Sequence, residues 1–203
     1  MLQIPLRYSM PTAFLFDMDG TLTIPRLDFD QIKREMGIGD GPILESLENL
    51  IGEQKIAAAA VLHRHERESA SNADLMEGCH ALLRWIDDLR IPRALITRNS
   101  RQSVDTVLSK HQLQFDVVIS RDDCRHKPHP DPLFLACEKL RVDVKNAWMI
   151  GDGSYDVKAG IAAGAKTIWI SHRRARDFTE EPWQVMDDLL HLMNWMKKYC
   201  AQS

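Results

Sequence analysis

The sequence predicts an α/β fold: a doubly wound, Rossmann-like parallel sheet with a small α-helical cap inserted after the first strand. Short apolar runs recur along the chain with amphipathic stretches between them, which is typical of buried parallel strands that alternate with helices. One early segment, residues 24–72, breaks this rhythm because it contains no strand-like run. With 203 residues and 44% hydrophobic content, the chain can bury one core and carry a modest insertion.

The apolar runs are expected to form the sheet. They are AFLF from Ala13, PRALIT ending at Thr97, DVVIS ending at Ser120, AWMIGD ending at Asp152 and KTIWIS from Lys166. Helical spacing is expected between the later runs and after the last one, over residues 100–111, 131–140, 154–164 and 183–200. Ser100, Asp131 and Ser154 are suitable N-cap residues for the first three of these helices.

The early insertion is expected to form the cap. Helices are predicted in it over residues 28–37, 41–52 and 53–73. We therefore divide the chain into an α/β core, residues 11–23 and 76–203, and a helical cap, residues 24–75. Ligands of open parallel sheets bind beyond the carboxyl ends of the strands. Because the insertion leaves from that edge, it is expected to cover the site as a lid.

The composition excludes several classes of protein. A net charge of −3 leaves no basic excess of the kind that nucleic-acid binding requires. No run approaches the roughly 18 apolar residues of a membrane span, and the N-terminus has no signal-peptide core. Cysteine pairing of the CxxC type is absent among Cys79, Cys124, Cys137 and Cys200. We expect reduced thiols in a cytoplasmic protein, monomeric by default, with no nucleic-acid or membrane partner. The first nine residues are expected either to form a loose extension or to precede a start at Met10.

Charged and polar side chains follow the first four predicted strands. They are Asp17 and Asp19, Thr97, Lys127, and Asp152 with Asp156. All are expected at one edge of the sheet, because the carboxyl ends of parallel strands meet there. Carboxylates held close together repel one another unless a hard cation or a lysine compensates, and an oxygen-only donor set suits Mg²⁺. The sequence therefore predicts a magnesium site.

Such a site can transfer a phosphoryl group. One carboxylate can attack phosphorus to form an aspartyl-phosphate, and a second can protonate the leaving alkoxide and later deprotonate water. A lysine and a threonine can bind the phosphoryl oxygens, over which charge spreads in the transition state.

Four motifs in register resemble those of the haloacid dehalogenase-like (HAD) superfamily. They are DMDGT at residues 17–21, Thr97, the pair Lys127-Pro128, and GDGSYD at residues 151–156. Their order and spacing are similar to those of the phosphoglycolate phosphatase-like members, which carry a small helical cap in the first insertion position. The resemblance spans residues 13–170. It implies a Mg²⁺-dependent phosphatase that acts on a small phosphorylated metabolite.

The resemblance also implies roles for individual residues. Asp17 would be the nucleophile and a Mg²⁺ ligand. Asp19 would be the general acid and base, with its backbone carbonyl on the metal. Thr97 would bind a phosphoryl oxygen, and Lys127 would neutralise the phosphoryl group and hold Asp17 ionised.

The remaining implied roles concern the metal and the substrate. Asp152 would bind Mg²⁺, and Asp156 would either bind it or orient its water ligands. Arg98 and Asn99 are expected to contact the substrate because they directly follow Thr97.

Three alternatives differ in how well they fit the sequence. Asp19 disfavours dehalogenation, since dehalogenases of the superfamily lack this second aspartate. A phosphomutase stays open, although the segment RLDFDQ at residues 26–31 lacks the histidine that such mutases carry there. A phospho-acceptor regulator shares the sheet, the aspartates and Mg²⁺, but has neither Asp19 nor a cap.

Two departures from the phosphoglycolate phosphatase pattern bear on the substrate. TIPRLDF follows DGTL at residues 23–29, where Val-Asp-Ser is usual, and the second strand ends in TRNS, where Thr-Asn is usual. Arg64 and Arg67, in a charged run of the cap, are candidates for contact with a substrate anion. The sequence therefore leaves the substrate unassigned.

Overall fold

The computed structural model describes residues 10–200, without the side chain of Cys200. The prediction about the first nine residues therefore lies outside the described residues. The chain forms two compact units: the first comprises the residues up to Ile24, Leu75–Arg98 and the chain from Phe115 onward, and the second comprises Pro25–Asp74 and Asn99–Gln114. The division into core and cap at residues 24–75 stays a prediction, because the second unit also takes in residues 99–114.

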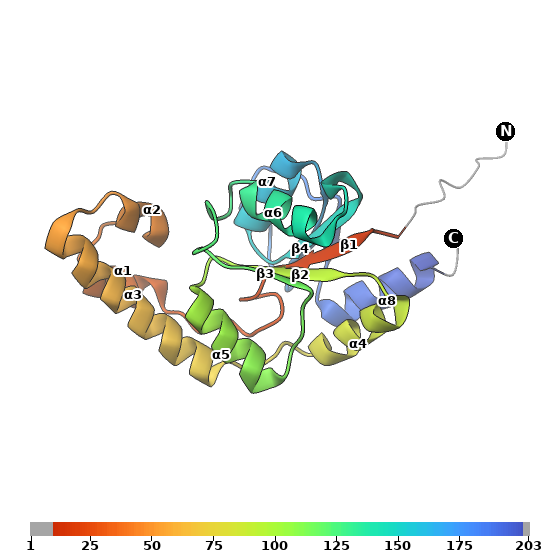
Figure 1. Ribbon diagram of the computed structural model, residues 1–203, viewed down its shortest axis with the longest axis horizontal. Helices are drawn as coiled ribbons and strands as arrows, with labels where there is room; N and C mark the ends of the chain where they lie inside the picture. The colour runs from red at the N-terminus through yellow and green to blue at the C-terminus, as the bar shows by residue number, and fades with distance from the viewer. Residues whose placement is uncertain (1–9, 201–203) are drawn as a thin grey trace. The chain divides into compact units, whose positions relative to one another are not determined.

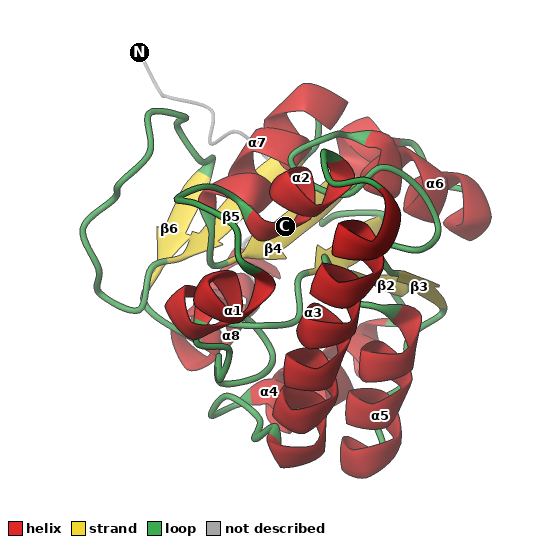
Figure 2. Ribbon diagram, turned by 90° about the vertical axis from the view of Figure 1, so that its left-hand side faces the viewer, coloured by secondary structure: helices red, strands yellow, loops and turns green. Residues whose placement is uncertain are grey.

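The first unit is built on a six-stranded, wholly parallel sheet, which confirms the predicted fold class. Its strands are β1 (Ala13–Phe16), β2 (Arg93–Ile96), β3 (Val117–Ile119), β4 (Ala147–Gly151), β5 (Lys166–Ile170) and β6 (Gln184–Met186). The spatial order is β3-β2-β1-β4-β5-β6. Figure 2 shows β5 and β6 toward one edge of the sheet and β2 and β3 toward the other. This is the strand order of a doubly wound sheet, in which the direction of winding reverses between β1 and β4.

Helices cover both faces of this sheet. They are α4 (Cys79–Leu89), α6 (Asp131–Leu140), α7 (Ser154–Ala163) and α8 (Leu189–Cys200), with a short 3₁₀ turn, η1 (Val144–Asn146), before β4. In Figure 1, α6 and α7 lie on one side of the strands and α4 and α8 on the other. The strands are therefore buried on both faces, which explains why their sequences are apolar throughout rather than alternating.

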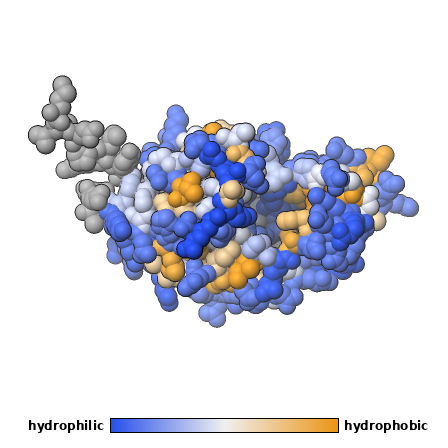
Figure 3. Space-filling view, turned by 180° about the vertical axis from the view of Figure 1, so that it is seen from behind, coloured by the Kyte–Doolittle hydropathy of each residue, from blue (hydrophilic) through white to orange (hydrophobic). Residues whose placement is uncertain are grey.

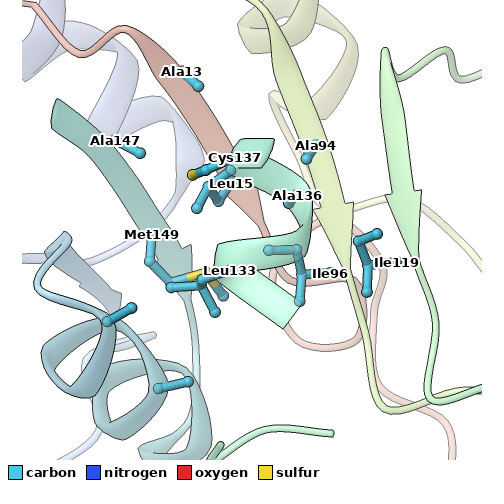
Figure 4. Packing of buried hydrophobic residues seen from close by; sticks show 12 residues of the cluster. Ala13, Leu15, Ala94, Ile96, Ile119, Leu133, Ala136, Cys137, Ala147 and Met149 are labelled. Carbon is cyan, nitrogen blue, oxygen red and sulfur yellow. The ribbon is translucent and has the colours of Figure 1, made fainter. Parts of the chain in front are cut away.

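Small and branched side chains fill the layer beneath α6 and α7. Figure 4 shows Leu133 and Ala136 of α6 packed above Leu15, Ile96 and Met149 of the central strands. Each of these five side chains is at most 1% exposed. The alternate positions of the same strands face the other way, because successive side chains of a strand point to opposite faces.

The second unit is helical. It contains α1 (Phe29–Met36), α2 (Ile43–Glu48), α3 (Gly52–Asn72) and α5 (Arg101–His111). Asp28 caps α1 by accepting a hydrogen bond from the backbone N–H of Gln31 at 2.8 Å, and Gly37 ends the helix in the left-handed conformation. Lys110 of α5 donates to the carbonyl oxygens of Ser71 and Ala73, at 2.8 and 2.7 Å, and so holds the end of α3.

The structure corrects the sequence analysis in the tail. The predicted helix over residues 183–200 is wrong in its first part, because Gln184–Met186 forms β6 beside β5. Asp188 explains the boundary: its carboxylate accepts the backbone N–H of His191 at 2.7 Å, so α8 begins at Leu189. Helix α4, which the sequence analysis does not name, covers the sheet before β2.

Two helix starts also differ from the predicted ones. Pro130 and Gly153, rather than Asp131 and Ser154, occupy the N-cap positions of α6 and α7. Ser100 is at the N-cap of α5 as predicted, but its hydroxyl bonds to Ser103 Oγ at 3.0 Å instead of to the helix backbone.

One face of the molecule is mostly hydrophilic, and two of the thiols are buried. Hydrophilic side chains cover most of the face in Figure 3, with hydrophobic ones in small separate patches. Within residues 10–200, no helix has both the length and the apolar character needed to cross a bilayer. Cys79 and Cys137 are free and buried, and burial raises the pKa of the first to about 12 and of the second to about 11. These two thiols are therefore unreactive, as expected for core residues.

Candidate active site

The candidate site lies where the winding of the sheet reverses. Asp17 directly follows β1 and Asp152 directly follows β4, and these two strands are neighbours. The backbone N–H of Asp17 donates to the carbonyl oxygen of Ile150 at 2.9 Å, which fixes the two strand ends against each other. Doubly wound sheets bind their ligands at this switch point, so the topology alone brings these carboxylates to a ligand-binding position.

Lys127 is the cation at the centre of the site. Its Nζ donates to Asp17 Oδ1 and to Asp156 Oδ1, each at 2.6 Å, and to the carbonyl oxygen of Ile96 at 2.8 Å. An ammonium group has three donors, and these three acceptors use all of them. Lys127 is 2% exposed. Its ammonium group is therefore buried among these acceptors, unlike that of a loop lysine in solvent.

Three carboxylates gather around this lysine. One oxygen each from Asp17, Asp152 and Asp156 lies within 4.8 Å of the others. Glycines make the approach possible: a Cβ on Gly20, whose φ is +82°, would meet Asp152 Oδ2 at 2.3 Å, and a Cβ on Gly151 would meet Asp156 Cγ at 2.2 Å. Gly20 of DMDGT and Gly151 of GDGSYD therefore leave the space that these carboxylates occupy.

Asp156 has a second, structural task. It lies in the first turn of α7, and its Oδ2 accepts the backbone N–H of Gly153 at 3.1 Å while its Oδ1 accepts from Lys127. A carboxylate is favoured there because the N-terminus of a helix carries partial positive charge. Both oxygens are thus already hydrogen-bonded, and whether Asp156 would bind a metal directly or through water stays a prediction.

The electrostatics show an excess of negative charge. Burial is the main reason why the pKa of Asp17 is raised well above its ordinary value, with Asp156 and Asp152 adding to the effect and Lys127 opposing it. Burial also raises the pKa of Asp152, helped by Asp156 and opposed by Arg174. For Lys127, burial favours the neutral form, but Asp156 and Asp17 outweigh it, so its pKa is raised and it stays charged. Lys127 and Arg174 together bring two positive charges to three carboxylates.

This donor set fits a hard divalent cation. All three side chains offer oxygen, two of them are buried, and their mutual repulsion would be relieved by a cation between them. Carboxylate oxygens suit hard cations such as Mg²⁺, whose coordination water and phosphate oxygens can complete.

Asp19 lies apart from this cluster. Among the described residues, its side chain is not one of the carboxylates that approach within 4.8 Å of one another. Its Oδ1 instead accepts a hydrogen bond from Thr23 Oγ1 at 2.9 Å. Thr97 is buried directly after β2, where its backbone N–H donates to Ile119 O at 3.0 Å. The roles assigned to Asp19 and Thr97 stay predictions.

Arg98 contacts the loop that carries Lys127. Its guanidinium donates to the carbonyl oxygen of Lys127 and lies over the ring of Tyr155, with Cζ 4.0 Å from the ring centroid. Its Nη1 is also 3.1 Å from His126 Nδ1. Substrate contact by Arg98 stays a prediction, as does that by Asn99, which belongs to the second compact unit.

In the second unit, Arg64 pairs with Glu35, and His65 Nε2 lies 3.0 Å from the same carboxylate. The pKa of Glu35 is lowered, chiefly because His65 and Gln31 hydrogen-bond to it. Neither this cluster nor the sequence assigns Arg64 or Arg67 to a substrate.

Sequence reasoning missed several residues that contact the site. Arg174 Nη2 donates to Asp152 Oδ2 at 2.9 Å, and His172 Nε2 lies 2.6 Å from the carbonyl oxygen of Gly20. Both belong to the basic run SHRRARD, residues 171–177, which directly follows β5. The sequence places this run after a predicted strand and leaves a phosphate-site role open for it, but singles out neither residue. For Thr23 the only signal is a hydroxyl four residues after Asp19.

Comparisons with known proteins identify the family of this chain. The family model described as "Haloacid dehalogenase-like hydrolase" matches residues 14–170. A haloacid dehalogenase-like hydrolase domain-containing protein of Arabidopsis thaliana is 30% identical over 75% of this chain and 68% of its own length. Pyrophosphatase PpaX of Bacillus mycoides is 30% identical over 88% of this chain and 94% of its own.

A solved structure supports the fold. The structure of CbbY from Rhodobacter sphaeroides in complex with phosphate superposes with a TM-score of 0.67, at 22% identity, over 90% of this chain and 96% of that one. The match to the family model covers all four motifs, and the predicted resemblance is confirmed. The chain belongs to the haloacid dehalogenase-like hydrolase family.

Proposed function

We propose that the protein is a Mg²⁺-dependent phosphatase that hydrolyses a small phosphomonoester through an aspartyl-phosphate on Asp17. The observation that carries this proposal is the buried Lys127, which bonds at 2.6 Å to both Asp17 and Asp156 at the switch point of the sheet. A lysine in this position holds Asp17 as a nucleophile and offers positive charge to an incoming phosphoryl group.

The proposed reaction has two displacements. Lys127 donates to Asp17 Oδ1 at 2.6 Å, whereas Oδ2 accepts a longer hydrogen bond of 3.4 Å from Thr21 Oγ1. Oδ2 is therefore proposed to attack phosphorus, and the bond from phosphorus to the leaving oxygen breaks. Asp19 gives its proton to that leaving oxygen. In the second step Asp19 takes a proton from water, the water oxygen attacks phosphorus, and the bond to Asp17 breaks to release inorganic phosphate.

Other residues bind and orient the phosphoryl group. Thr97 and Lys127 are proposed to hold its oxygens. Asp17, Asp152 and Asp156, with the backbone carbonyl of Asp19, would hold Mg²⁺, which when bound offsets the negative charge shared by the carboxylates and the phosphoryl group. Support comes from the oxygen-only donor set within 4.8 Å and from the raised pKa values of Asp17 and Asp152.

Hydrolysis of 4-nitrophenyl phosphate tests this proposal. We expect turnover by the purified protein with Mg²⁺, loss of turnover after chelation with EDTA, and recovery when Mg²⁺ is restored. Asp17→Asn should lower turnover by at least about 10⁴-fold, because the nucleophile is gone. Asp88→Asn, an exposed aspartate of α4, is the matched control and should behave as the wild type. Equal activity in Asp17→Asn and wild type would contradict the proposal.

A panel of phosphorylated metabolites would identify the substrate. It should include inorganic pyrophosphate, since the relative from Bacillus mycoides is named as a pyrophosphatase. We propose that residues 24–75 act as the cap that selects among these compounds, in a monomeric cytoplasmic enzyme. A phosphomutase would isomerise a sugar phosphate in the panel, whereas a phospho-acceptor regulator would accumulate a long-lived phosphoprotein without releasing phosphate.

A further inference from the structure

Thr23 is a fully buried polar residue next to the proposed acid and base, and the backbone holds it at both ends. Its N–H donates to Met18 O at 2.9 Å, and its carbonyl oxygen accepts from Gly20 N at 2.8 Å. It also forms isolated β-bridges to Asp19 on one side and to Leu75 on the other. These backbone hydrogen bonds and bridges fix the position of the Thr23 side chain without any bound substrate.

The hydroxyl of Thr23 has two acceptors within reach. Oγ1 lies 2.9 Å from Asp19 Oδ1 and 3.3 Å from Met18 O. A hydroxyl has one proton to give, and a carboxylate at the shorter distance is the stronger acceptor. Met18 O already accepts from backbone N–H groups, those of Thr21, Leu22 and Thr23, at 3.2, 2.8 and 2.9 Å. The Thr23 hydroxyl therefore donates its proton to Asp19 Oδ1 and not to Met18 O.

We propose that Thr23 is a positioning residue for Asp19. Its hydroxyl fixes Oδ1, so that Oδ2 faces the leaving group and, later, the attacking water. This inference rests on the proposed function, because it assumes that Asp19 transfers the proton. Proton transfer requires hydrogen-bond geometry between the carboxyl and the leaving oxygen, and a carboxyl that rotates spends less time in that geometry.

Thr23→Val tests the proposal, because valine keeps the branched shape and removes only the hydroxyl. A leaving group that is a strong base needs a proton, whereas 2,4-dinitrophenolate leaves without one. We expect kcat/KM for phenyl phosphate to fall about tenfold, the equivalent of one hydrogen bond to a charged group. For 2,4-dinitrophenyl phosphate it should stay within about twofold of the wild type. The inhibition constant of inorganic phosphate should not change, and Thr23→Ser should restore most of the activity.

Two further variants separate positioning from general stability. Thr167→Val removes another buried hydroxyl, which accepts the backbone N–H of Trp183 at 3.3 Å, and should lower activity on neither substrate. In an Asp19→Asn background, Thr23→Val should produce no further loss, because residues that act through one another are not additive. An equal fall on both substrates, or a full tenfold loss in the Asp19→Asn background, would overturn the proposal.

Failure of the proposed function would give a different result. If the wild type hydrolyses neither substrate with Mg²⁺, the phosphatase proposal fails, and the positioning of Asp19 is then decided by crystal structures of the wild type and Thr23→Val. The expected result is an ordered Asp19 carboxyl in the wild type and a rotated or disordered one in the variant. The same orientation in both would overturn the inference on its own terms.

Discussion

The two ends of strands β1 and β4 have opposite chemistry. Near their amino ends, Phe14 and Trp148 are register partners, and their rings meet edge to face with centroids 5.8 Å apart. At their carboxyl ends the same strands present Asp17 and Asp152. Within a few residues the chain changes from a stacked aromatic cluster to a cluster of carboxylates that repel one another.

The aromatic end is held by contacts that carry no net charge. Trp148 also meets the rings of Trp183, Trp195 and Tyr199, with centroids 5.0 to 5.7 Å apart, and the last two come from α8. Such rings bury large apolar areas, and each well-oriented pair adds roughly 0.5–1.5 kcal/mol. This end stabilises the sheet at any pH at which the protein is folded.

The carboxylate end, in contrast, is expected to lower the stability of the sheet when no ligand is bound. Its three carboxylates are compensated by Lys127 and by one partly exposed arginine, Arg174, on Asp152. Active sites commonly hold charges in arrangements that lower stability in the absence of a ligand. The aromatic cluster therefore stabilises the same strands whose carboxyl ends carry the clustered carboxylates.

The largest effect is expected from Lys127→Met, which removes the charge but keeps the length of the side chain. Breaking a buried ion pair leaves uncompensated charge, so the free energy of unfolding should fall by about 3–5 kcal/mol. Turnover should fall by roughly 10²- to 10³-fold, because a group that stabilises transition-state charge is lost. Urea denaturation and 4-nitrophenyl phosphate hydrolysis measure the two effects.

A matched control for this variant lies on the surface. Lys158 is 3.9 Å from Glu180, and both side chains are at least 30% exposed. Exposed pairs contribute at most about 1 kcal/mol, so Lys158→Met should change stability little and activity not at all. An equal loss of unfolding free energy in both variants would show that the burial of Lys127 does not account for its contribution to stability.

At the aromatic end, Trp148→Ala should lower the free energy of unfolding by about 3–5 kcal/mol, because it leaves a cavity between several rings. In contrast to Lys127→Met, kcat/KM per folded molecule should stay within about threefold of the wild type. Thermal denaturation and assays below the unfolding transition separate the two quantities. A loss of activity greater than tenfold in fully folded protein would show that the two ends are not independent.

The part of this organisation that depends on local pattern could be predicted from the sequence. Buried strands are apolar throughout, so AFLF and AWMIGD mark β1 and β4, and the acids directly after them mark the switch point. The cluster of Asp17, Asp152, Asp156 and Lys127 followed from topology, since parallel strands bring their carboxyl ends together.

What could not be predicted depends on contacts between distant segments or on single hydrogen bonds. Residues Gln184–Met186 form β6 because they pair with the outer edge of β5. Their own sequence continues the helical pattern of the tail. The contact of Arg174 with Asp152 joins residues that no local pattern connects. Thr23 is missed because a buried threonine after a turn has no signal until its oxygen is placed beside Asp19.

The smallest effect expected is a pH dependence that only the carboxylate end should show. Burial raises the pKa of Asp17 in the folded protein well above its unfolded value, so metal-free protein binds this proton more tightly when folded. The corresponding stability is fully present below about pH 4 and is lost as pH rises through the folded pKa. Asp17→Asn cannot ionise, so in EDTA it should become more stable than the wild type as pH rises.

The variant is therefore expected to be more stable than the wild type at pH 8 and equally stable at pH 4, below the unfolded pKa of an aspartate. Urea denaturation at both pH values measures this difference, and comparing variant with wild type removes the contribution of other titrating groups. Saturating Mg²⁺ should stabilise the wild type more than Asp17→Asn, because a ligand of the native state stabilises it more when it binds more tightly. A wild type more stable than Asp17→Asn in EDTA at pH 8 would mean that Lys127 outweighs the repulsion, and that the carboxylate end stabilises the sheet as the aromatic end does.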